Sequence, residues 1–109
     1  MKPVILVVDD EPNLRTVLAA NLRLEDYHPI TAVDGADAIE VLQTEDVHVI
    51  ISDIRMPNVD GMALLNHVTD NYPLLPVIMI TAHGTVDTAV EAMKLGAVDY
   101  ITKPFDQEE

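Results

Sequence analysis

Short runs of aliphatic residues alternate along this chain with longer stretches in which apolar residues recur at helical spacing. The runs fall at residues 4–8, 28–33, 47–52, 76–81 and 99–101. The first and third, VILVV and VHVII, are almost continuously apolar, which is typical of central strands buried on both faces. The alternation predicts an α/β fold in which helices cover a parallel sheet.

Two of the intervening stretches carry a clear apolar stripe, which predicts amphipathic helices packed against a core. The stripes consist of Leu14, Val17, Leu18 and Leu22, and of Val86, Ala89, Val90 and Met93. Pro12 suits a first helical turn, and Asp34 and Thr85 are expected to be N-caps. Gly96 stands where the second of these helices needs a left-handed C-cap.

Length and composition limit the architecture to one domain, which we place at residues 1–109. The chain has 109 residues, of which 49% are hydrophobic, enough for one core. No apolar run approaches the roughly 20 residues that span a bilayer. The N-terminus shows no secretory signal, and without cysteine there is no disulfide framework or thiolate metal site. These features suit the cytoplasm and argue against a membrane partner.

The charge balance excludes one large class of partner. The formal net charge is -13, and only six residues are Lys or Arg. Binding to a nucleic-acid backbone requires clustered Lys and Arg. We therefore expect no direct nucleic-acid binding by this chain.

The residues that leave the apolar runs carry the candidate chemistry. In an open α/β sheet, ligands bind at the carboxyl ends of the strands. The relevant segments are Asp9-Asp10-Glu11, Ser52-Asp53, Thr81-Ala82-His83 and Thr102-Lys103-Pro104. Three acids, a hydroxyl and a lysine are thus expected to converge at one edge of the sheet.

This combination of side chains favours phosphoryl transfer. Asp9, Asp10 and Asp53 would repel one another unless a divalent cation and Lys103 compensate their charge. Ligands that offer only oxygen favour a hard cation, with Mg²⁺ preferred because the site leaves room for water and phosphate. Asp53, at the end of a central strand, is the best nucleophile, and the Thr81 hydroxyl is placed to bond the phosphoryl oxygens.

Each of these residues also has an ordinary structural interpretation. Paired aspartates after a strand can simply cap the next helix. Lys103 alone would be a solvated surface lysine, and Thr81 alone a hydroxyl bonded to backbone. Tyr100 alone would be a half-buried packing residue of a short strand. The combination, rather than any single residue, favours the functional interpretation.

Four motifs together resemble the receiver domain of two-component response regulators. They are VVDDEP, SDIRMPNVDG, ITAHGTVDTAVEAMKLGA and DYITKPF, in this order and at matching separations. The last two are similar to the receivers of nitrogen-regulator-type (NtrC-like) enhancer-binding transcription activators. The resemblance implies a flavodoxin-like, doubly wound, five-stranded parallel sheet of order 2-1-3-4-5. Because residues 105–109 look like the first turn of a fifth helix, we expect that helix to be truncated.

The resemblance also assigns roles around the metal. It implies that Asp53 is the phosphoacceptor, that Asp10 binds Mg²⁺ directly, and that Asp9 acts partly through water. The backbone carbonyl of Arg55 completes the protein ligands, and Mn²⁺ is expected to substitute for Mg²⁺. The side chains of Arg55 and His83 lie two residues after the acceptor and the hydroxyl, so we expect them to tune phosphate lifetime.

A second group of roles concerns the conformational switch. The resemblance implies that Thr81 is the switch hydroxyl, Tyr100 the switch aromatic and Lys103 the phosphate-contacting lysine. A cis bond is expected before Pro104. Phosphorylation would draw Thr81 inward and let Tyr100 rotate, which shifts an existing equilibrium of the surface around the fourth helix and fifth strand.

The resemblance implies a signalling switch that catalyses only its own phosphorylation and dephosphorylation. The phosphoryl donor would be a sensor histidine kinase, and the output would be transcription. ATPase and DNA-binding modules are expected outside this chain, and homodimerisation is a further expectation.

Three alternatives stay open at this stage. A phosphohydrolase on a similar sheet would carry Asp-x-Asp after the first strand, whereas this chain has adjacent Asp9 and Asp10. A flavin or nucleotide binder would have a Ser/Thr/Gly-rich phosphate loop there, but DDEPN repels phosphate unless a cation intervenes. The third alternative is a scaffolding receiver that is never phosphorylated.

Overall fold

The computed structural model describes residues 2–53, 61–81 and 86–102, in which strands and helices alternate. The elements are β1 (Val4–Val8), α1 (Pro12–Leu24), β2 (His28–Ala32), α2 (Gly35–Thr44), β3 (Val49–Asp53), α3 (Gly61–Asn71), β4 (Val77–Thr81), α4 (Val86–Leu95) and β5 (Asp99–Thr102). The strands form one sheet of order β2-β1-β3-β4-β5. Every neighbouring pair is parallel.

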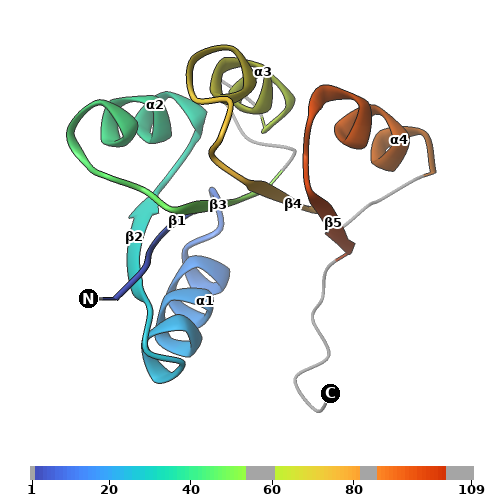
Figure 1. Ribbon diagram of the computed structural model, residues 1–109. Coiled ribbons are helices and arrows are strands. Elements are labelled where there is room, and N and C mark those ends of the chain that lie inside the picture. Colours follow the sequence, from blue (N-terminus) through green and yellow to red (C-terminus); the bar gives the residue numbers. More distant parts are fainter. Residues whose placement is uncertain (1, 54–60, 82–85, 103–109) are drawn as a thin grey trace.

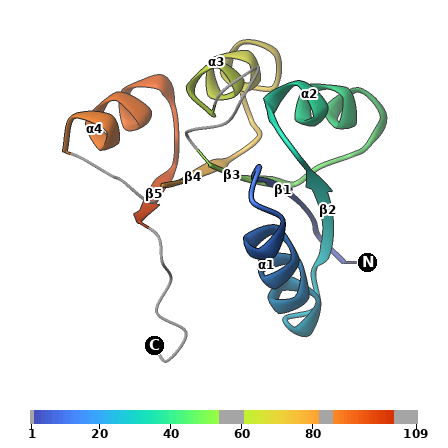
Figure 2. The ribbon, with the colours of Figure 1, turned by 180° about the vertical axis from the view of Figure 1, so that it is seen from behind.

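Helices lie on both faces of this sheet. Helices α2, α3 and α4 cover one face, and α1 lies on the other (Figure 1). The opposite view shows the same two layers around the sheet (Figure 2). The predicted flavodoxin-like α/β class and the strand order 2-1-3-4 are confirmed. The fifth helix was predicted at residues 105–109, which lie outside the described residues.

Several strand boundaries differ from the prediction by one or two residues, and at two of them a side chain accepts a hydrogen bond from a backbone amide. Strand β2 ends at Ala32 rather than Val33, since the Val33 amide donates to the carboxylate of Asp37 (3.1 Å). Strand β3 begins at Val49 rather than Val47. The amide of Val4, which faces this end of β3, donates to the His48 ring at 2.9 Å. Strand β3 also extends to Asp53, β4 begins at Val77 and β5 extends to Thr102, so Asp53 ends its strand rather than following it.

The main core lies between the sheet and helices α2, α3 and α4. Side chains alternate along each strand, so every second residue faces this layer. Leu6 and Val8 of β1, Ile50 of β3 and Met79 of β4 are fully buried here, as are Leu64 and Leu65 of α3. This packing holds the carboxyl ends of β1 and β3 in fixed positions.

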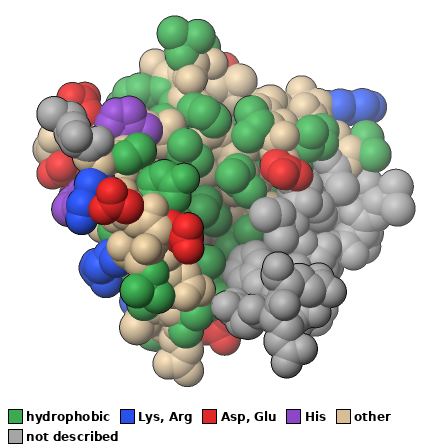
Figure 3. All heavy atoms as spheres, turned by 60° about the horizontal axis from the view of Figure 1, so that its bottom comes forward, with side chains coloured by type: hydrophobic (Ala, Val, Ile, Leu, Met, Phe, Trp, Pro, Cys, Tyr) green, Lys and Arg blue, Asp and Glu red, His purple; other side chains and the backbone are tan. Residues whose placement is uncertain are grey.

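The opposite face of the sheet is covered unevenly within the described part of the chain. Ile5 and Val7 of β1 are buried on the face where α1 packs. Their partners across the sheet, Val49 and Ile51, are only half-buried, and so is Ile78, the partner of Ile51 on β4. Figure 3, which turns this side forward, shows hydrophobic side chains across its middle. Among the described helices, none is long and apolar enough to cross a membrane.

The predicted helix ends are confirmed where the structure describes them, whereas Val17, Val90 and Met93 of the predicted apolar stripes are exposed rather than packed in the core. Helix α1 begins at Pro12. Proline has no amide hydrogen, but amides in the first turn of a helix have no acceptor within the helix, so no hydrogen bond is lost. Asp34 caps α2 by accepting a hydrogen bond from the Asp37 amide at 2.8 Å. Thr85, the other predicted cap, lies outside the described residues.

Gly96 has the predicted left-handed conformation after α4, with φ of 114°. The Gly96 amide donates to Met93 and the Ala97 amide donates to Ala92, which satisfies carbonyls at the helix end. A Cβ on Gly96 would lie 3.1 Å from Cγ2 of Thr69 on α3. The Thr69 hydroxyl also donates to the Leu95 carbonyl at 3.0 Å. Conformation and close packing therefore both require glycine here.

Gly96→Ala is expected to lower the free energy of unfolding by about 1–3 kcal/mol, since a Cβ strains this conformation and crowds Thr69. Urea unfolding followed by circular dichroism measures the change. Thr69→Ser removes the crowding methyl and keeps the hydroxyl, so it should recover part of the loss in the double variant. If the two substitutions change the free energy of unfolding additively in the double variant, crowding between the added Cβ at position 96 and Thr69 contributes nothing to the loss.

Candidate functional site

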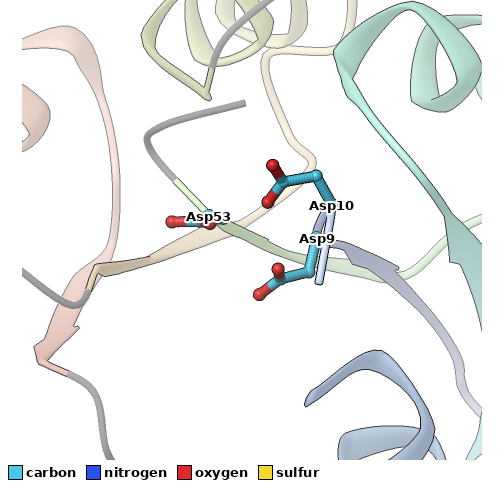
Figure 4. A group of neighbouring side chains, drawn as sticks. All are labelled: Asp9, Asp10 and Asp53. Carbon is cyan, nitrogen blue, oxygen red and sulfur yellow. The ribbon is translucent and has the colours of Figure 1, made fainter. Parts of the chain in front are cut away.

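Two neighbouring strands bring three carboxylates together. Strands β1 and β3 are parallel, and Val8 pairs with Ser52. The next residue on each strand is therefore an aspartate at the same level of the sheet, Asp9 after β1 and Asp53 at the end of β3. Figure 4 shows these two side chains together with Asp10, which follows Asp9. The predicted convergence of the three acids is confirmed.

The cluster lies where the connections from adjacent strands go to opposite faces. The chain leaves β1 toward α1, whereas the helix that follows β3, α3, lies on the other side of the sheet (Figure 1). Such a divergence is the usual ligand position in open α/β sheets.

Each of the three acids offers a carboxylate oxygen within 4.8 Å of the other two. The Asp9 side chain is fully buried and that of Asp53 is 6% exposed, whereas Asp10 is exposed. Three negative charges at this spacing repel one another, and burial of two of them removes much of the screening by water. Positive charge near the cluster would therefore stabilise this arrangement.

The donor set fits a hard divalent cation. All three ligand atoms are carboxylate oxygens, the ligands that Mg²⁺ and Ca²⁺ prefer. Opposite ligands of one Mg²⁺ lie about 4.2 Å apart. A 4.8 Å spread therefore suits an ion that contacts some of these oxygens directly and another through water. The exposed Asp10 leaves one side of the site accessible to solvent.

Asp9 is held in place through its backbone as well as its side chain. Its amide donates to Ala32 of β2 at 3.2 Å, and its carboxylate accepts a hydrogen bond from the Glu11 amide at 2.9 Å. Its carbonyl accepts a hydrogen bond from the Arg15 guanidinium at 2.7 Å. Asp9 thus bonds the amide of Glu11, the N-cap residue of α1, without capping an amide of the helix itself, and it also faces the other acids.

The end of β3 is anchored by its own hydroxyl. Ser52 is fully buried, and its Oγ donates to the backbone carbonyl of Asp53 at 2.9 Å. This bond and the pairing of Asp53 with Ile80 restrain the backbone that carries the carboxylate, so little backbone entropy remains to be lost when the carboxylate engages a ligand.

The structure places the other predicted site residues only in part. Thr81 ends β4, one residue beyond Ile80, which pairs with Asp53. Tyr100 lies in β5 and pairs with Met79. The side chains of Thr81 and Tyr100 lie outside the described part of the structure, as do Arg55, His83, Lys103 and Pro104.

Sequence reasoning missed Arg15. The residue lies in the middle of an amphipathic pattern, where a charged side chain is normally solvated. One signal was present, because an arginine near the start of a helix opposes the helix dipole unless acids lie nearby.

Nearly the whole chain is similar in sequence to known proteins. Residues 5–109 match the model of the response regulator receiver domain family. A putative NtrX-like response regulator of Rickettsia felis is 42% identical over 106 residues, which cover 95% of this chain and 22% of that protein. The DNA-binding transcriptional regulator NtrC of Escherichia coli is 43% identical over 106 residues, covering 97% of this chain and 23% of NtrC.

Solved structures agree with the sequence relatives. The receiver domain of NtrX from Brucella abortus has a TM-score of 0.89 at 39% identity, with coverage of 95% of this chain and 88% of that one. The chemotaxis protein CheY4 of Vibrio cholerae has a TM-score of 0.92 at 30% identity, covering 99% and 92%. The chain spans less than a quarter of the two curated relatives. It belongs to the response regulator receiver domain family.

Proposed function

We propose that Asp53 is the residue on which this receiver domain accepts a phosphoryl group, from the phosphohistidine of a sensor histidine kinase. The observation that carries the proposal is the position of Asp53. It ends a central strand, is almost buried, and has two further carboxylates within 4.8 Å. A carboxylate held by a rigid strand is a prepared nucleophile.

The reaction uses one oxygen of Asp53. This oxygen forms a bond to phosphorus while the bond between phosphorus and the histidine nitrogen breaks, and the bonding electrons stay with the imidazole. The product is an acyl phosphate, which water later hydrolyses to restore the carboxylate. Mg²⁺, or Mn²⁺ in its place, supplies positive charge to the phosphoryl oxygens when bound.

We assign the remaining roles around this acceptor. Asp10 is a direct metal ligand, Asp9 acts partly through water, and the carbonyl of Arg55 completes the protein ligands. The exposure of Asp10 and the burial of Asp9 support this division, because the exposed carboxylate adjusts more easily to an incoming ion.

Under the same proposal, we assign roles to the residues that act on the phosphoryl group and in the conformational switch. Lys103 contacts the phosphoryl group, and a cis bond precedes Pro104. Thr81 and Tyr100 carry the change toward α4 and β5. The side chains of Arg55 and His83 set the lifetime of the acyl phosphate.

The output of the whole protein is transcription, by analogy with relatives such as NtrC that are described as DNA-binding transcriptional regulators. ATPase and DNA-binding modules outside residues 1–109 would carry it out in the cytoplasm. A fifth helix completes the receiver, and homodimerisation is part of the same proposal. The net charge of -13 supports a signalling role without direct contact to nucleic acid.

Intact mass after incubation with acetyl phosphate tests the acceptor chemistry. The expected result is a gain of one phosphoryl mass with Mg²⁺, and none when the metal is removed by a chelator. Metal-free chain should regain the reaction when Mn²⁺ is added. Loss of the adduct at alkaline pH would identify it as an acyl phosphate rather than a phosphoserine.

Two outcomes would contradict the proposal. A gain that is independent of metal would mean that the reaction needs no cation bound at the acidic cluster. A chain that binds Mg²⁺ but never gains mass would favour a scaffolding receiver.

A further inference from the structure

Arg15 joins the first helix to the acidic cluster. Its Nη1 donates to the backbone carbonyl of Asp9 at 2.7 Å, a short charge-assisted hydrogen bond. The side chain is half-buried, so this contact is screened less than a surface ion pair. The bond links residues on two elements that meet beside the site, the end of β1 and the first turns of α1.

We propose that Arg15 is a positioning residue that sets the geometry of the acidic cluster by fixing the Asp9–Asp10 peptide. The inference rests on the proposed function of the cluster as a Mg²⁺ site. Arg15 donates to a carbonyl rather than to a carboxylate, so this bond itself occupies none of the candidate ligand oxygens.

The peptide plane explains how one bond orients two acids. A peptide group is planar from one Cα to the next. A guanidinium that holds the Asp9 carbonyl oxygen therefore fixes the direction in which the chain reaches Cα of Asp10. The Asp9 amide is already held by Ala32, so both ends of Asp9 are restrained. Asp10, which is exposed, depends on this restraint more than Asp9 does.

The position of Arg15 in α1 also favours this role. It is the fourth residue of a helix that begins at Pro12. The positive end of the helix dipole disfavours a cation there, whereas the three nearby carboxylates favour it. The planar guanidinium keeps several donors in a fixed arrangement, whereas the ammonium of lysine is a mobile point charge. Both features suit a residue that orients the backbone of an acidic site.

Arg15 affects metal binding in two opposite ways, so the direction in which Mg²⁺ affinity changes shows which effect is larger. As a positive charge it repels Mg²⁺, so its removal alone would tighten binding. As a positioning residue it preserves the arrangement of the ligands, so its removal weakens binding. Loss of an outer-shell partner commonly weakens metal binding by about 10- to 100-fold. We expect the positioning effect to be larger.

The experiment titrates the chain with Mg²⁺ and follows backbone amide signals by NMR, in wild type, Arg15→Met and Arg15→Lys. Arg15→Met is expected to bind Mg²⁺ about 10-fold more weakly. Arg15→Lys keeps the charge and most of the stem, so it should lie between this variant and wild type. Arg23→Met is the matched control, because Arg23 is exposed in the last turn of the same helix. Its affinity should equal that of wild type.

A second measurement, on the metal-free chain, tests whether Arg15 fixes the Asp9–Asp10 peptide without relying on Mg²⁺ binding. Both Arg15 variants should change the signals of the Asp10 and Glu11 amides and speed hydrogen exchange at Glu11, while thermal unfolding by circular dichroism stays cooperative. Unchanged amide signals, or Mg²⁺ binding in Arg15→Met as tight as in wild type or tighter, would overturn the inference. Failure of wild type to bind Mg²⁺ would count against the proposed function, and the Glu11 amide would still decide on Arg15.

Discussion

Asp53→Asn is expected to abolish the gain of phosphoryl mass from acetyl phosphate, while the chain stays folded. Asparagine has nearly the same shape as aspartate, but its amide lacks the anionic oxygen that attacks phosphorus. The neighbouring acids cannot replace it, because Asp9 accepts a hydrogen bond from the Glu11 amide and Asp10 lies on an exposed segment rather than a strand. Intact mass spectrometry with Mg²⁺ present measures the loss.

Asp46→Asn is the matched control for this variant. Asp46 is exposed before β3, at the opposite end of the strand from Asp53, and its substitution changes the net charge equally. The control should gain the full phosphoryl mass. Retention of the adduct in Asp53→Asn would place the acceptor on another residue.

The same Asp53→Asn substitution should stabilise the metal-free chain. It removes one of three carboxylates that lie within 4.8 Å, and the one removed is almost buried. Less repulsion remains in the folded state, whereas the unfolded chain gains little. Urea unfolding without metal should thus give a higher midpoint for Asp53→Asn than for wild type, and an unchanged midpoint for Asp46→Asn.

Adding Mg²⁺ is expected to stabilise wild type by about 2.7 kcal/mol when the ion is at 100 times its Kd, since it binds the folded state alone. Urea unfolding at increasing Mg²⁺, near pH 7, measures the gain. Asp10→Asn should reduce the apparent affinity, so its stability curve rises only at higher Mg²⁺. Arg23→Met should follow wild type.

Ionic strength needs its own control here. With a net charge of -13, any salt screens repulsion across the chain and raises stability. NaCl at matched ionic strength should therefore give a smaller gain than MgCl₂, and the same gain in wild type and Asp10→Asn. Equal gains with the two salts would mean that screening, not a bound ion, stabilises the chain.

The sequence allowed much of the fold and the centre of the site to be predicted. Continuous apolar runs marked the central strands, and parallel strands place their carboxyl ends on one edge. These two facts suffice to predict that Asp9 and Asp53 lie close together. Gly96 was predictable for a similar reason, since a helix end that turns left-handed strongly favours glycine.

Other features depend on three-dimensional detail that periodicity does not contain. The bond from Arg15 to the Asp9 carbonyl depends on how α1 is rotated against β1, which a stripe of apolar residues fixes only roughly. The start of β3 depends on a side chain, the His48 ring, taking the Val4 amide. The contact of Gly96 with Thr69 joins two helices that no local pattern connects.

The uneven cover of the sheet gives the acidic composition a second significance. Val49, Ile51 and Ile78 present a half-buried apolar strip on the face where α1 covers only part of the sheet. Two copies that meet through such strips would bury apolar area, while at neutral pH their like charges oppose this particular contact. Near the isoelectric point of about 4.3 that repulsion vanishes while the strip remains. In the isolated chain of residues 1–109, the excess of carboxylates thus opposes non-specific association through this strip, and acidification would favour it.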